Sequence, residues 1–273
     1  MTISILGCGW LGFPTGRHLL SIGYQVNGST TNDEKLNKLK KSGINPYLIR
    51  ISDQIESDSD DSFWDTDILF LNIPPGRAKE NFEKRHPLQI QAIIDKVSQH
   101  NISWVIYASS TSVYPKFGGI TTEEDALSET AFSLSGKTLL ACEQLLNEHS
   151  NFDTTVIRFG GLYGYDRHPV KYLAGRENLS EGNKPINLIH QDDCIRILAE
   201  VIKKDARNQV FNAVSDGHPP RKAFYQSAAS HFGLDIPHFK KDENSGYRIV
   251  SNEKIKNHLD YRFLYPNPMD HTP

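Results

Sequence analysis

Three glycines near the N-terminus have the spacing of a phosphate-binding loop. They are the first, third and last of residues 7–12, which read GCGWLG and form a G-x-G-x-x-G pattern. In such a loop Gly7 permits a tight turn, Gly9 lets the backbone approach a diphosphate, and Gly12 lets a helix pack closely on a strand. The helix N-terminus adds amide donors and partial positive charge. The alternative is a glycine-rich turn without a ligand. Because an apolar strand precedes the pattern and a helix that ends at Gly23 follows it, we expect the loop to bind a dinucleotide.

The residues expected to choose between NADP and NAD follow the second predicted strand. NAD-binding proteins usually place Asp or Glu there to hold the ribose hydroxyls. Here residues 27–31 read NGSTT, and the first acidic residue is Asp33. The missing carboxylate removes the repulsion that a 2′-phosphate would meet, and Ser29, Thr30 and Thr31 offer hydroxyl groups. The same cluster could instead cap the helix that follows. We therefore favour NADP as the cofactor, with NAD as the alternative.

Short apolar runs alternate with helical patterns along the first 160 residues. Several runs are almost continuously apolar, as in parallel strands that helices cover on both faces. Strands are predicted at residues 3–6, 24–26, 47–51, 68–73, 104–108 and 155–158, and helices at residues 11–22, 33–41, 87–100 and 133–149. This alternation predicts an α/β fold with a Rossmann-type, doubly wound parallel sheet.

The second half of the chain has a looser pattern. It predicts a loop at residues 160–183, a helix from Asp192 as its N-cap, a strand at residues 210–214 and a helix at residues 221–231. Residues 53–61 are acidic and serine-rich and predict a solvated loop. We expect a dinucleotide-binding Rossmann domain over residues 1–160, to which residues 186–214 return. A small C-terminal substrate-binding portion would then consist of residues 161–185 and 215–273.

Four runs resemble motifs of one enzyme family. Residues 107–114 (YASSTSVY) resemble its S-S-x-x-V-Y-G strand end, residues 158–164 (RFGGLYG) its R-x-x-x-x-Y-G segment, residues 187–193 (NLIHQDD) its N-x-I-H-x-x-D segment, and residues 211–214 (FNAV) its F/Y-N-V strand. They follow the family's order over nearly the whole chain. The sequence thus resembles the extended short-chain dehydrogenases/reductases, the NAD-dependent epimerase/dehydratase family. The resemblance implies NAD(P) binding and a polar small-molecule substrate such as a nucleotide sugar.

Two departures mark the chain as an atypical member. Most extended members carry G-x-x-G-x-x-G, whereas residues 7–12 have the shorter pattern. The family's mechanism uses a Tyr that exchanges a proton with the substrate and, four residues later, a Lys that lowers the pKa of that Tyr. Aligning residues 141–146 with the family's helix puts Ser135 and Leu139 at these positions. None of the eleven tyrosines has a Lys four residues later, so the usual pair is absent from its usual place.

The remaining candidates for catalysis are hydroxyl groups. Ser110 matches the serine with which the family binds the substrate oxygen. It also ends a predicted strand, where open α/β sheets bind ligands. Its alternative role is to cap that strand end. Tyr114 could supply a phenol or form part of the pocket wall, and Ser135 at the tyrosine position is the third candidate.

The resemblance also implies which segments contact the substrate and the cofactor. The expected substrate-binding residues are Arg158, Tyr163, Arg167, His168, Asn187 and His190. Arginine suits a phosphate or carboxylate, and histidine can supply a proton near neutral pH. For His190 the alternative is a bond from the ring to the backbone at a helix start. Beyond the residues already named, the expected cofactor contacts are Trp10, Leu11, Arg50, Ile73, Pro74 and Ser109. Instead of contacting the cofactor, the prolines after residue 73 could only stiffen that loop.

Composition argues against several other classes of function. The 273 residues carry a formal net charge of −3, which offers no positive field to nucleic acid or anionic lipid. Three cysteines without a C-x-x-C pair predict reduced thiols, and no metal site is expected. We expect no signal peptide and no membrane span, hence a cytoplasmic protein. Relatives often dimerise through the helices matching residues 87–100 and 133–149, so a homodimer is one expectation.

Two functions therefore remain open from the sequence. The first is an NAD(P)-dependent oxidoreductase or epimerase-like enzyme with a nonstandard proton donor, acting on a polar small metabolite. The second is a catalytically silent NADP-binding sensor that regulates a partner. The missing Tyr–Lys pair favours the sensor. The retained Ser110 and the R-x-x-x-x-Y-G segment favour the enzyme.

Overall fold

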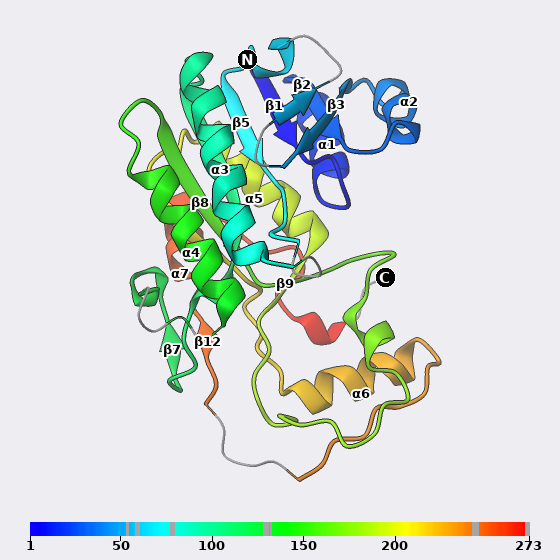
Figure 1. The fold of residues 1–273 in the computed structure, drawn as a ribbon. Coiled ribbons are helices and arrows are strands. Elements are labelled where there is room, and N and C mark those ends of the chain that lie inside the picture. Colours follow the sequence, from blue (N-terminus) through cyan, green and yellow to red (C-terminus); the bar gives the residue numbers. More distant parts are fainter. Residues whose placement is uncertain are drawn as a thin grey trace.

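An eight-stranded sheet organises the computed structural model of this chain (Figure 1). The structure describes residues 1–52, 55–57, 61–76, 80–127, 131, 133–241 and 246–270. The strands of the sheet are β1 (Thr2–Leu6), β2 (Gln25–Thr30), β3 (Asn45–Ile51), β4 (Ile55–Ser57), β5 (Ile68–Leu71), β6 (Trp104–Ser110), β8 (Asp153–Phe159) and β11 (Val210–Ala213). Their order is β11-β8-β6-β5-β1-β2-β3-β4. The pairs are parallel except for the edge strand β4, which is antiparallel to β3.

The strand order reverses between β1 and β5. From β1 the chain moves outward through β2 and β3. It then crosses back to β5 and continues through β6, β8 and β11 on the other side. In open α/β sheets the crevice at the carboxyl ends of the strands, at such a reversal, is where ligands bind. The predicted Rossmann-type, doubly wound α/β sheet is confirmed.

Helices cover both faces of the sheet, as nearly continuous apolar strands require. On one face α1 (Gly12–Ser21), α2 (Glu34–Lys41) and α5 (Gln191–Lys203) share a hydrophobic cluster with the strands. On the other face α3 (Phe82–Gln99) and α4 (Leu134–Asn147) lie side by side, in front of the sheet in Figure 1. Ile5 belongs to the first cluster and its neighbour Leu6 to the second, because successive strand side chains point to opposite faces.

The largest boundary differences in the first half concern β2 and α3. β2 continues through the polar residues 27–30, because their backbone pairs with β1 on one side and β3 on the other. α3 begins at Phe82 instead of residue 87, and it contains Pro87. The Asn81 carbonyl accepts from the N–H groups of Lys84 and Arg85, so a hydrogen-bonded turn precedes the proline. The acidic run 53–61 was predicted to be a loop, and this is wrong for residues 55–57, which form the edge strand β4 because their backbone pairs with β3. Residues 53–54 and 58–60 of the run lie outside the described residues.

A smaller group of elements lies beyond the carboxyl ends of the strands (Figure 1). It contains the parallel pair β9 (Gly161–Tyr163) and β10 (Leu188–His190), the helix α6 (Arg221–His231), and the parallel pair β7 (Ile120–Thr121) and β12 (Ile249–Val250). The helix at 221–231 was predicted correctly. The prediction of a loop at 160–183 missed β9, because a strand of three residues is too short to show a periodic pattern.

The C-terminal segment returns to the main sheet. α7 (Glu253–Leu259) places Ile255 and Leu259 in the cluster of α1 and α5, although both follow the predicted boundary at residue 215. The buried Asp193 carboxylate holds the next residues. It accepts hydrogen bonds from the Tyr261 hydroxyl at 2.7 Å, the Leu264 N–H at 2.8 Å and the Tyr265 N–H at 3.0 Å. The far end of the chain is thereby fixed against α5.

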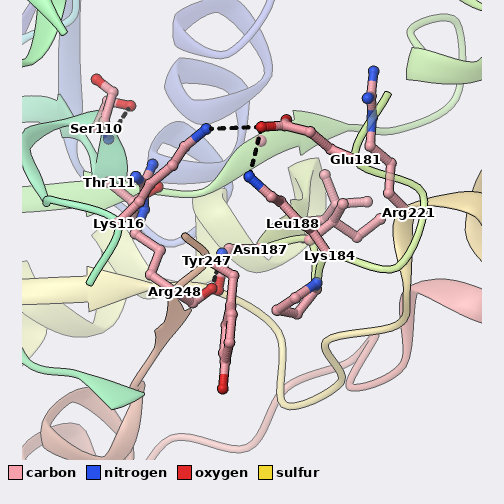
Figure 2. A pocket seen from close by; sticks show the side chains of 14 residues that line it. Ser110, Thr111, Lys116, Glu181, Lys184, Asn187, Leu188, Arg221, Tyr247 and Arg248 are labelled. Carbon is pink, nitrogen blue, oxygen red and sulfur yellow. Dashed lines mark hydrogen bonds and ion pairs between the residues drawn. The ribbon is translucent and has the colours of Figure 1, made fainter. Parts of the chain in front are cut away.

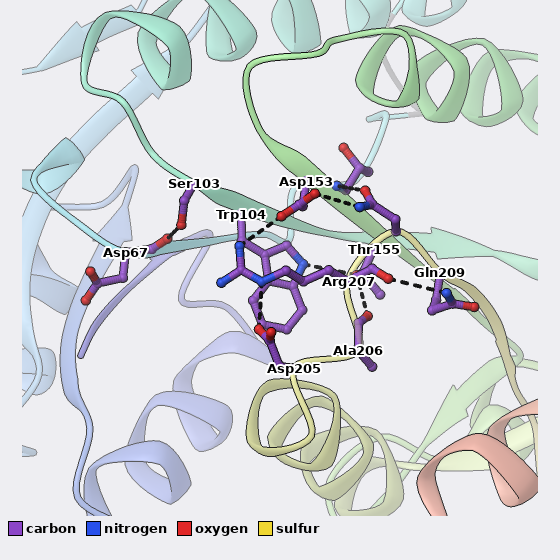
Figure 3. A network of polar contacts seen from close by, with 11 residues as sticks. Asp67, Ser103, Trp104, Asp153, Thr155, Asp205, Ala206, Arg207 and Gln209 are labelled. Atoms are coloured by element: carbon purple, nitrogen blue, oxygen red, sulfur yellow. Dashed lines mark hydrogen bonds and ion pairs between the residues drawn. The ribbon is translucent and has the colours of Figure 1, made fainter.

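A polar network joins the amino ends of β6 and β8, on the sheet edge opposite the glycine loop (Figure 3). Arg207 donates to Asp153 at 2.9 Å and to Asp205 at 2.6 Å, and its guanidinium lies 4.8 Å from the Trp104 ring centroid. The hydrogen bond from Arg207 lowers the pKa of Asp153. The Thr155 hydroxyl accepts from the Trp104 indole at 3.0 Å. This network fixes the turn before β11 and lies away from the ligand-binding edge.

The three cysteines are buried and free. Burial raises the pKa of Cys8 and of Cys142 to about 12, so these thiols stay protonated and are poor nucleophiles. In the described ranges no helix combines the length and the apolar content needed to cross a bilayer.

Candidate functional site

The glycine loop lies at the carboxyl end of β1, beside the reversal in strand order. Gly7 has a φ of +108°, and a Cβ atom there would lie 2.5 Å from the Asn72 carbonyl oxygen. A Cβ atom on Gly12 would lie 2.3 Å from the Gly7 carbonyl oxygen. Around a Cβ atom on Gly9, by contrast, no described atom lies within 4 Å. Two glycines therefore close the turn, and the third leaves open space against its backbone.

Side chains on β2 and directly after β5 donate to or accept from the backbone of this loop. The Gly7 N–H donates to the Ser29 hydroxyl at 2.9 Å, and the Cys8 N–H donates to the Ser29 carbonyl at 2.8 Å. Directly after β5, the Asn72 amide donates to the Gly7 carbonyl at 2.9 Å. Ser29 was expected to contact the cofactor, but it is 2% exposed and lies beneath the loop. Its role in this structure is to position the loop.

The ends of β2 and β3 present a hydroxyl and a guanidinium to solvent. Thr30 is buried, and its hydroxyl accepts from the Asn32 N–H at 3.2 Å. Thr31 is exposed. Arg50, at the end of β3, pairs with Asp33 at 3.8 Å, and both side chains are largely exposed. The expected contacts Thr31 and Arg50 thus remain accessible, whereas Thr30 stabilises the turn.

Trp10 joins the glycine loop to the segment after β9. Its indole donates to the Asp166 carboxylate at 2.8 Å, and its carbonyl accepts from the Gln191 amide at 2.7 Å. The Arg167 guanidinium lies 5.0 Å from the centroid of the Trp10 ring. Arg167 was expected at the substrate, but it lies over the glycine loop and is exposed. It therefore offers a cation on the cofactor side.

The other expected cofactor contacts lie around the same loop. Leu11 is buried in the core, so only its backbone faces the loop. Ile73 and Pro74 follow β5, and the Ile73 side chain approaches the Gly7 turn. Ser109 donates its hydroxyl to Glu143 at 2.5 Å and is 6% exposed. Ser109 therefore serves an internal network, in place of the predicted cofactor contact.

The centre of that network is an ion pair between Arg158 and Glu143. The Arg158 Nη2 lies 2.6 Å from a Glu143 oxygen, and the two side chains are 5% and 2% exposed. Burial works against the charge on Arg158, but Glu143 outweighs it and keeps the pKa of the guanidinium above its usual value. Because Arg158 on β8 has its charge neutralised by Glu143 on α4, the prediction that it binds substrate is wrong. It joins the sheet to the helix.

Tyr114 belongs to the same network and is fully buried. Its hydroxyl accepts a hydrogen bond from Arg158 at 2.8 Å and donates one to the side-chain Oδ1 of Asn212 at 2.6 Å. Burial raises the pKa of Tyr114 above its usual value. The phenol is therefore neutral and doubly bonded within the protein, so its prediction as a catalytic group is wrong. The alternative, a place in the pocket wall, is not borne out either, because Tyr114 is not among the described residues that line the cavity.

Three residues predicted to bind substrate are buried within the smaller group of elements beyond the strand ends. Tyr163, His168 and His190 are 1%, 4% and 0% exposed. The His168 Nδ1 accepts from the Val170 N–H at 3.3 Å. The His190 Nδ1 accepts from the Asp192 N–H at 3.2 Å, so His190, and not Asp192, is the N-cap of α5. Burial lowers the pKa of His190. The backbone-bonding alternative for His190 is confirmed.

A cavity of about 320 Å³ opens where β6 ends, between the sheet and the smaller group of elements (Figure 2). This volume is at the lower end of the range for small-molecule sites. Its described lining residues come from five separate segments: Ser110, Thr111, Ser112, Lys116, Gly161, Glu181, Lys184, Pro185, Ile186, Asn187, Leu188, Arg221, Tyr247 and Arg248. Two predicted site residues, Ser110 and Asn187, are brought together here. Arg167 is not among these lining residues.

The two predicted residues also support the walls of the cavity. The Ser110 hydroxyl accepts from the Ser112 N–H at 3.2 Å, which is the expected capping role. The Asn187 side chain donates to the Arg248 carbonyl at 3.2 Å and accepts from the Val250 N–H at 2.8 Å. Asn187 therefore holds the strand that carries Arg248 against β10.

No sequence pattern pointed to the cations of this cavity. Lys116, Lys184, Arg221 and Arg248 line it, yet no fixed spacing links them, because they lie on three loops and the start of α6. The topology alone brings them together. Among the described residues no cluster of His, Cys, Asp and Glu could hold a metal ion.

The helix face that carries the family's Tyr and Lys holds neither side chain here. Ser135 at the tyrosine position is 9% exposed, and Leu139 at the lysine position is 3% exposed. The Ser135 hydroxyl has no hydrogen-bond partner among the described residues. A Cβ atom on the adjacent Gly136 would lie 2.2 Å from the Ser112 carbonyl oxygen, so α4 packs directly on the turn after β6. No titratable group of this helix face takes the place of the pair.

Comparison with known proteins places the chain in a family. Protein YeeZ of Escherichia coli (strain K12) is 30% identical over 270 residues, which cover 98% of this chain and 97% of that protein. The chain belongs to the YeeZ family. No family model matches the chain.

Solved structures similar to this YeeZ family member share its fold over nearly the whole chain. A functionally unknown conserved protein from Silicibacter pomeroyi has a TM-score of 0.80 at 23% identity, over 99% of this chain and 96% of that one. MoeE5, solved in complex with UDP-glucuronic acid and NAD, has a TM-score of 0.77 at 16% identity, over 99% and 97% of the two chains. The resemblance to the extended short-chain dehydrogenases/reductases, predicted from the motifs, is confirmed.

The Arg158–Glu143 pair yields a prediction about stability. Arg158→Met leaves the Glu143 carboxylate buried without its partner, so we expect a loss of about 3–5 kcal/mol in the free energy of unfolding. The double variant Arg158→Met/Glu143→Met removes both charges and should lose much less than the sum of the two single variants. Urea denaturation of the four proteins measures this coupling. Additive losses would show that the two side chains do not depend on each other.

Proposed function

We propose that this chain binds NADP or NAD at the glycine loop and acts on an anionic small metabolite in the adjacent cavity, as an oxidoreductase or epimerase-like enzyme. The observation that carries the proposal is the position of the cavity, which opens at the carboxyl end of β6, on the same sheet edge as the glycine loop. Its cationic lining suits phosphate or carboxylate groups. The similar fold of MoeE5, solved with UDP-glucuronic acid and NAD, supports a nucleotide sugar as one candidate substrate.

The residues around the glycine loop fit a dinucleotide. The open space around Gly9, next to the N-terminus of α1, would receive the diphosphate, because amide groups at a helix N-terminus donate to anions. Arg167 over the Trp10 ring would add a positive charge at the same place. Pro74, after the neighbouring strand, would lie along the nicotinamide half. When bound, the nicotinamide would supply hydride transfer.

The adenosine end of this site favours NADP. The turn after β2 carries the exposed Thr31, with Arg50 beside it. Asp33 is the first carboxylate there, and it is already paired with Arg50 at 3.8 Å. A 2′-phosphate would compete with Asp33 for the guanidinium, whereas a ribose hydroxyl would gain little from it. We therefore infer a preference for NADP.

On the substrate side, Ser110 would hold a substrate oxygen at the cavity wall. Ser135 contributes a buried hydroxyl from α4, but an aliphatic hydroxyl is a far weaker acid than a phenol beside a lysine. Lys116 and Lys184 are the titratable cations that line the cavity. Proton exchange would thus have to involve these ammonium groups, water or the substrate itself, which is the nonstandard step of this proposal.

A second candidate is a catalytically silent NADP-binding sensor. The burial of Leu139 and Ser135 on α4 favours it, because the usual proton-transfer pair is replaced by side chains that pack. A screen separates the two: the protein is incubated with NADP or NADPH and a panel of nucleotide sugars and phosphorylated metabolites, and products are followed by absorbance at the nicotinamide band and by NMR. Turnover supports the enzyme. Tight cofactor binding with no product from any compound supports the sensor.

Gly9→Asp tests the cofactor site. The open space at Gly9 admits a side chain without a clash, but its negative charge would repel a diphosphate. Saturating NADPH should raise the melting temperature of the unmodified protein by about 5 °C, and Gly9→Asp should abolish this shift. Gly9→Ala, which adds no charge, should retain most of it. An unchanged shift in Gly9→Asp would place the dinucleotide elsewhere.

Arg50→Ala tests the choice of cofactor. Removing the cation should weaken NADPH binding about tenfold, the effect of about one charge-assisted hydrogen bond, and leave NADH binding nearly unchanged. Calorimetry on both nucleotides measures the ratio. Lys41→Ala, another exposed cation near the end of α2, is the matched control and should change neither. Equal weakening for both nucleotides would contradict a role at the 2′-phosphate.

A further inference from the structure

The cationic cavity contains an anion of its own. One Glu181 oxygen lies 2.6 Å from the Lys184 ammonium and 3.5 Å from the Lys116 ammonium (Figure 2). All three side chains line the cavity and are between 14% and 35% exposed. The hydrogen bond from Lys184 and the charge of Lys116 lower the pKa of Glu181, so this carboxylate is ionised. The two lysines, which approach from different segments, thus meet at a single oxygen.

The backbone holds Glu181 in this position. Its φ is +64°, a left-handed conformation that side chains other than Gly and Asn rarely adopt. The Lys184 N–H donates to the Glu181 carbonyl at 3.3 Å, so residues 181–184 form a tight turn. The start of α6 fixes this turn, because the Arg221 N–H donates to the Lys184 carbonyl at 2.8 Å and the Arg221 guanidinium to the Ser180 carbonyl at 2.5 Å. Strained backbone of this kind persists only where the surrounding structure imposes it.

Among the described residues that line the cavity, basic side chains outnumber acidic ones. Four cations line it, and Glu181 is the acidic residue among its described lining residues. In the described part of the chain no carboxylate lies within ion-pair distance of Arg221 or Arg248. Burial lowers the pKa of Arg248, and an anion nearby would offset that cost. The cavity therefore retains capacity for negative charge even with Glu181 in place.

These contacts set a condition on the ligand. If a ligand group displaces Glu181, two adjacent ammonium groups lose their shared counter-ion. A carboxylate on the ligand would only exchange one single charge for another. A phosphate monoester or diphosphate, with two or more charges and several acceptor oxygens, would gain from both lysines and the arginines at once.

We propose that Glu181 is an internal counter-ion which the phosphate or diphosphate group of the ligand displaces, and that it makes the cavity select multiply charged anions over single carboxylates. This inference rests on the proposed function, because it concerns the same cavity. Glu181 acts as a specificity-determining residue: it lowers the affinity for every anion, and only a highly charged ligand overcomes it. Selection against weaker anions by a built-in competitor is a form of discrimination by repulsion.

The test is calorimetry on the full-length chain with two probes, inorganic pyrophosphate and acetate, at pH 7.5 and constant ionic strength. The unmodified protein should bind pyrophosphate and show little affinity for acetate. Glu181→Gln should bind pyrophosphate about tenfold more tightly and acetate measurably. Glu181→Gly, which also relieves the left-handed backbone, should show the same gain. Glu200→Gln on α5 is the matched control, because it breaks an equivalent i, i+3 pair with Lys203 outside the cavity.

Lys184→Gln reports whether pyrophosphate is bound in the cavity or at the glycine loop. It should weaken pyrophosphate binding at least tenfold, and Gly9→Asp should not. If pyrophosphate binding depends on Lys184 but neither Glu181 variant increases it, the role of Glu181 is overturned while the anion cavity stands. If Lys184→Gln has no effect, or no protein binds pyrophosphate, the proposed substrate site itself is overturned.

Discussion

The close approach of two backbone segments at Gly7 and Gly12 is the constraint on which the ligand-binding edge depends. A side chain on either glycine would overlap a carbonyl oxygen, so β1 and α1 can pack at this distance only without Cβ atoms. Once they do, Ser29 from β2 and Asn72, the residue after β5, reach the loop from both sides. The reversal in strand order and the loop are thus parts of one arrangement, in which each neighbouring strand contributes a hydrogen bond.

Several residues in the motifs that resemble the extended short-chain dehydrogenases/reductases stabilise the fold of this chain. Arg158, Tyr114 and Asn212 come from three of the four recognised runs, and they bond to one another and to Glu143 in the interior. These motif residues therefore connect the sheet, α4 and the segment after β6 to one another. Shared motifs identified the fold correctly, but their residues could not be equated with ligand contacts.

The sequence predicted the fold well and the site in part, for different physical reasons. Apolar periodicity and glycine spacing are local signals, and they located α1, the loop that Gly9 leaves open and every strand of the main sheet except β4. Burial is not local: Ser29, Thr30 and His190 are polar, and only the assembled structure shows that they satisfy backbone groups. The cavity cations Lys116 and Arg248 lie 132 positions apart in the numbering, so no spacing rule could join them.

The bond between Trp10 and Gln191 has a consequence for how the protein is made. The two residues are 181 positions apart, so when the ribosome has released the first β–α–β unit, the loop still lacks one of its supports. The strands β8 and β11 are also added late to a sheet begun at residue 2. A growing chain would carry an unfinished glycine loop until more than two thirds of its length had emerged. The loop would then reach its final form only late in synthesis.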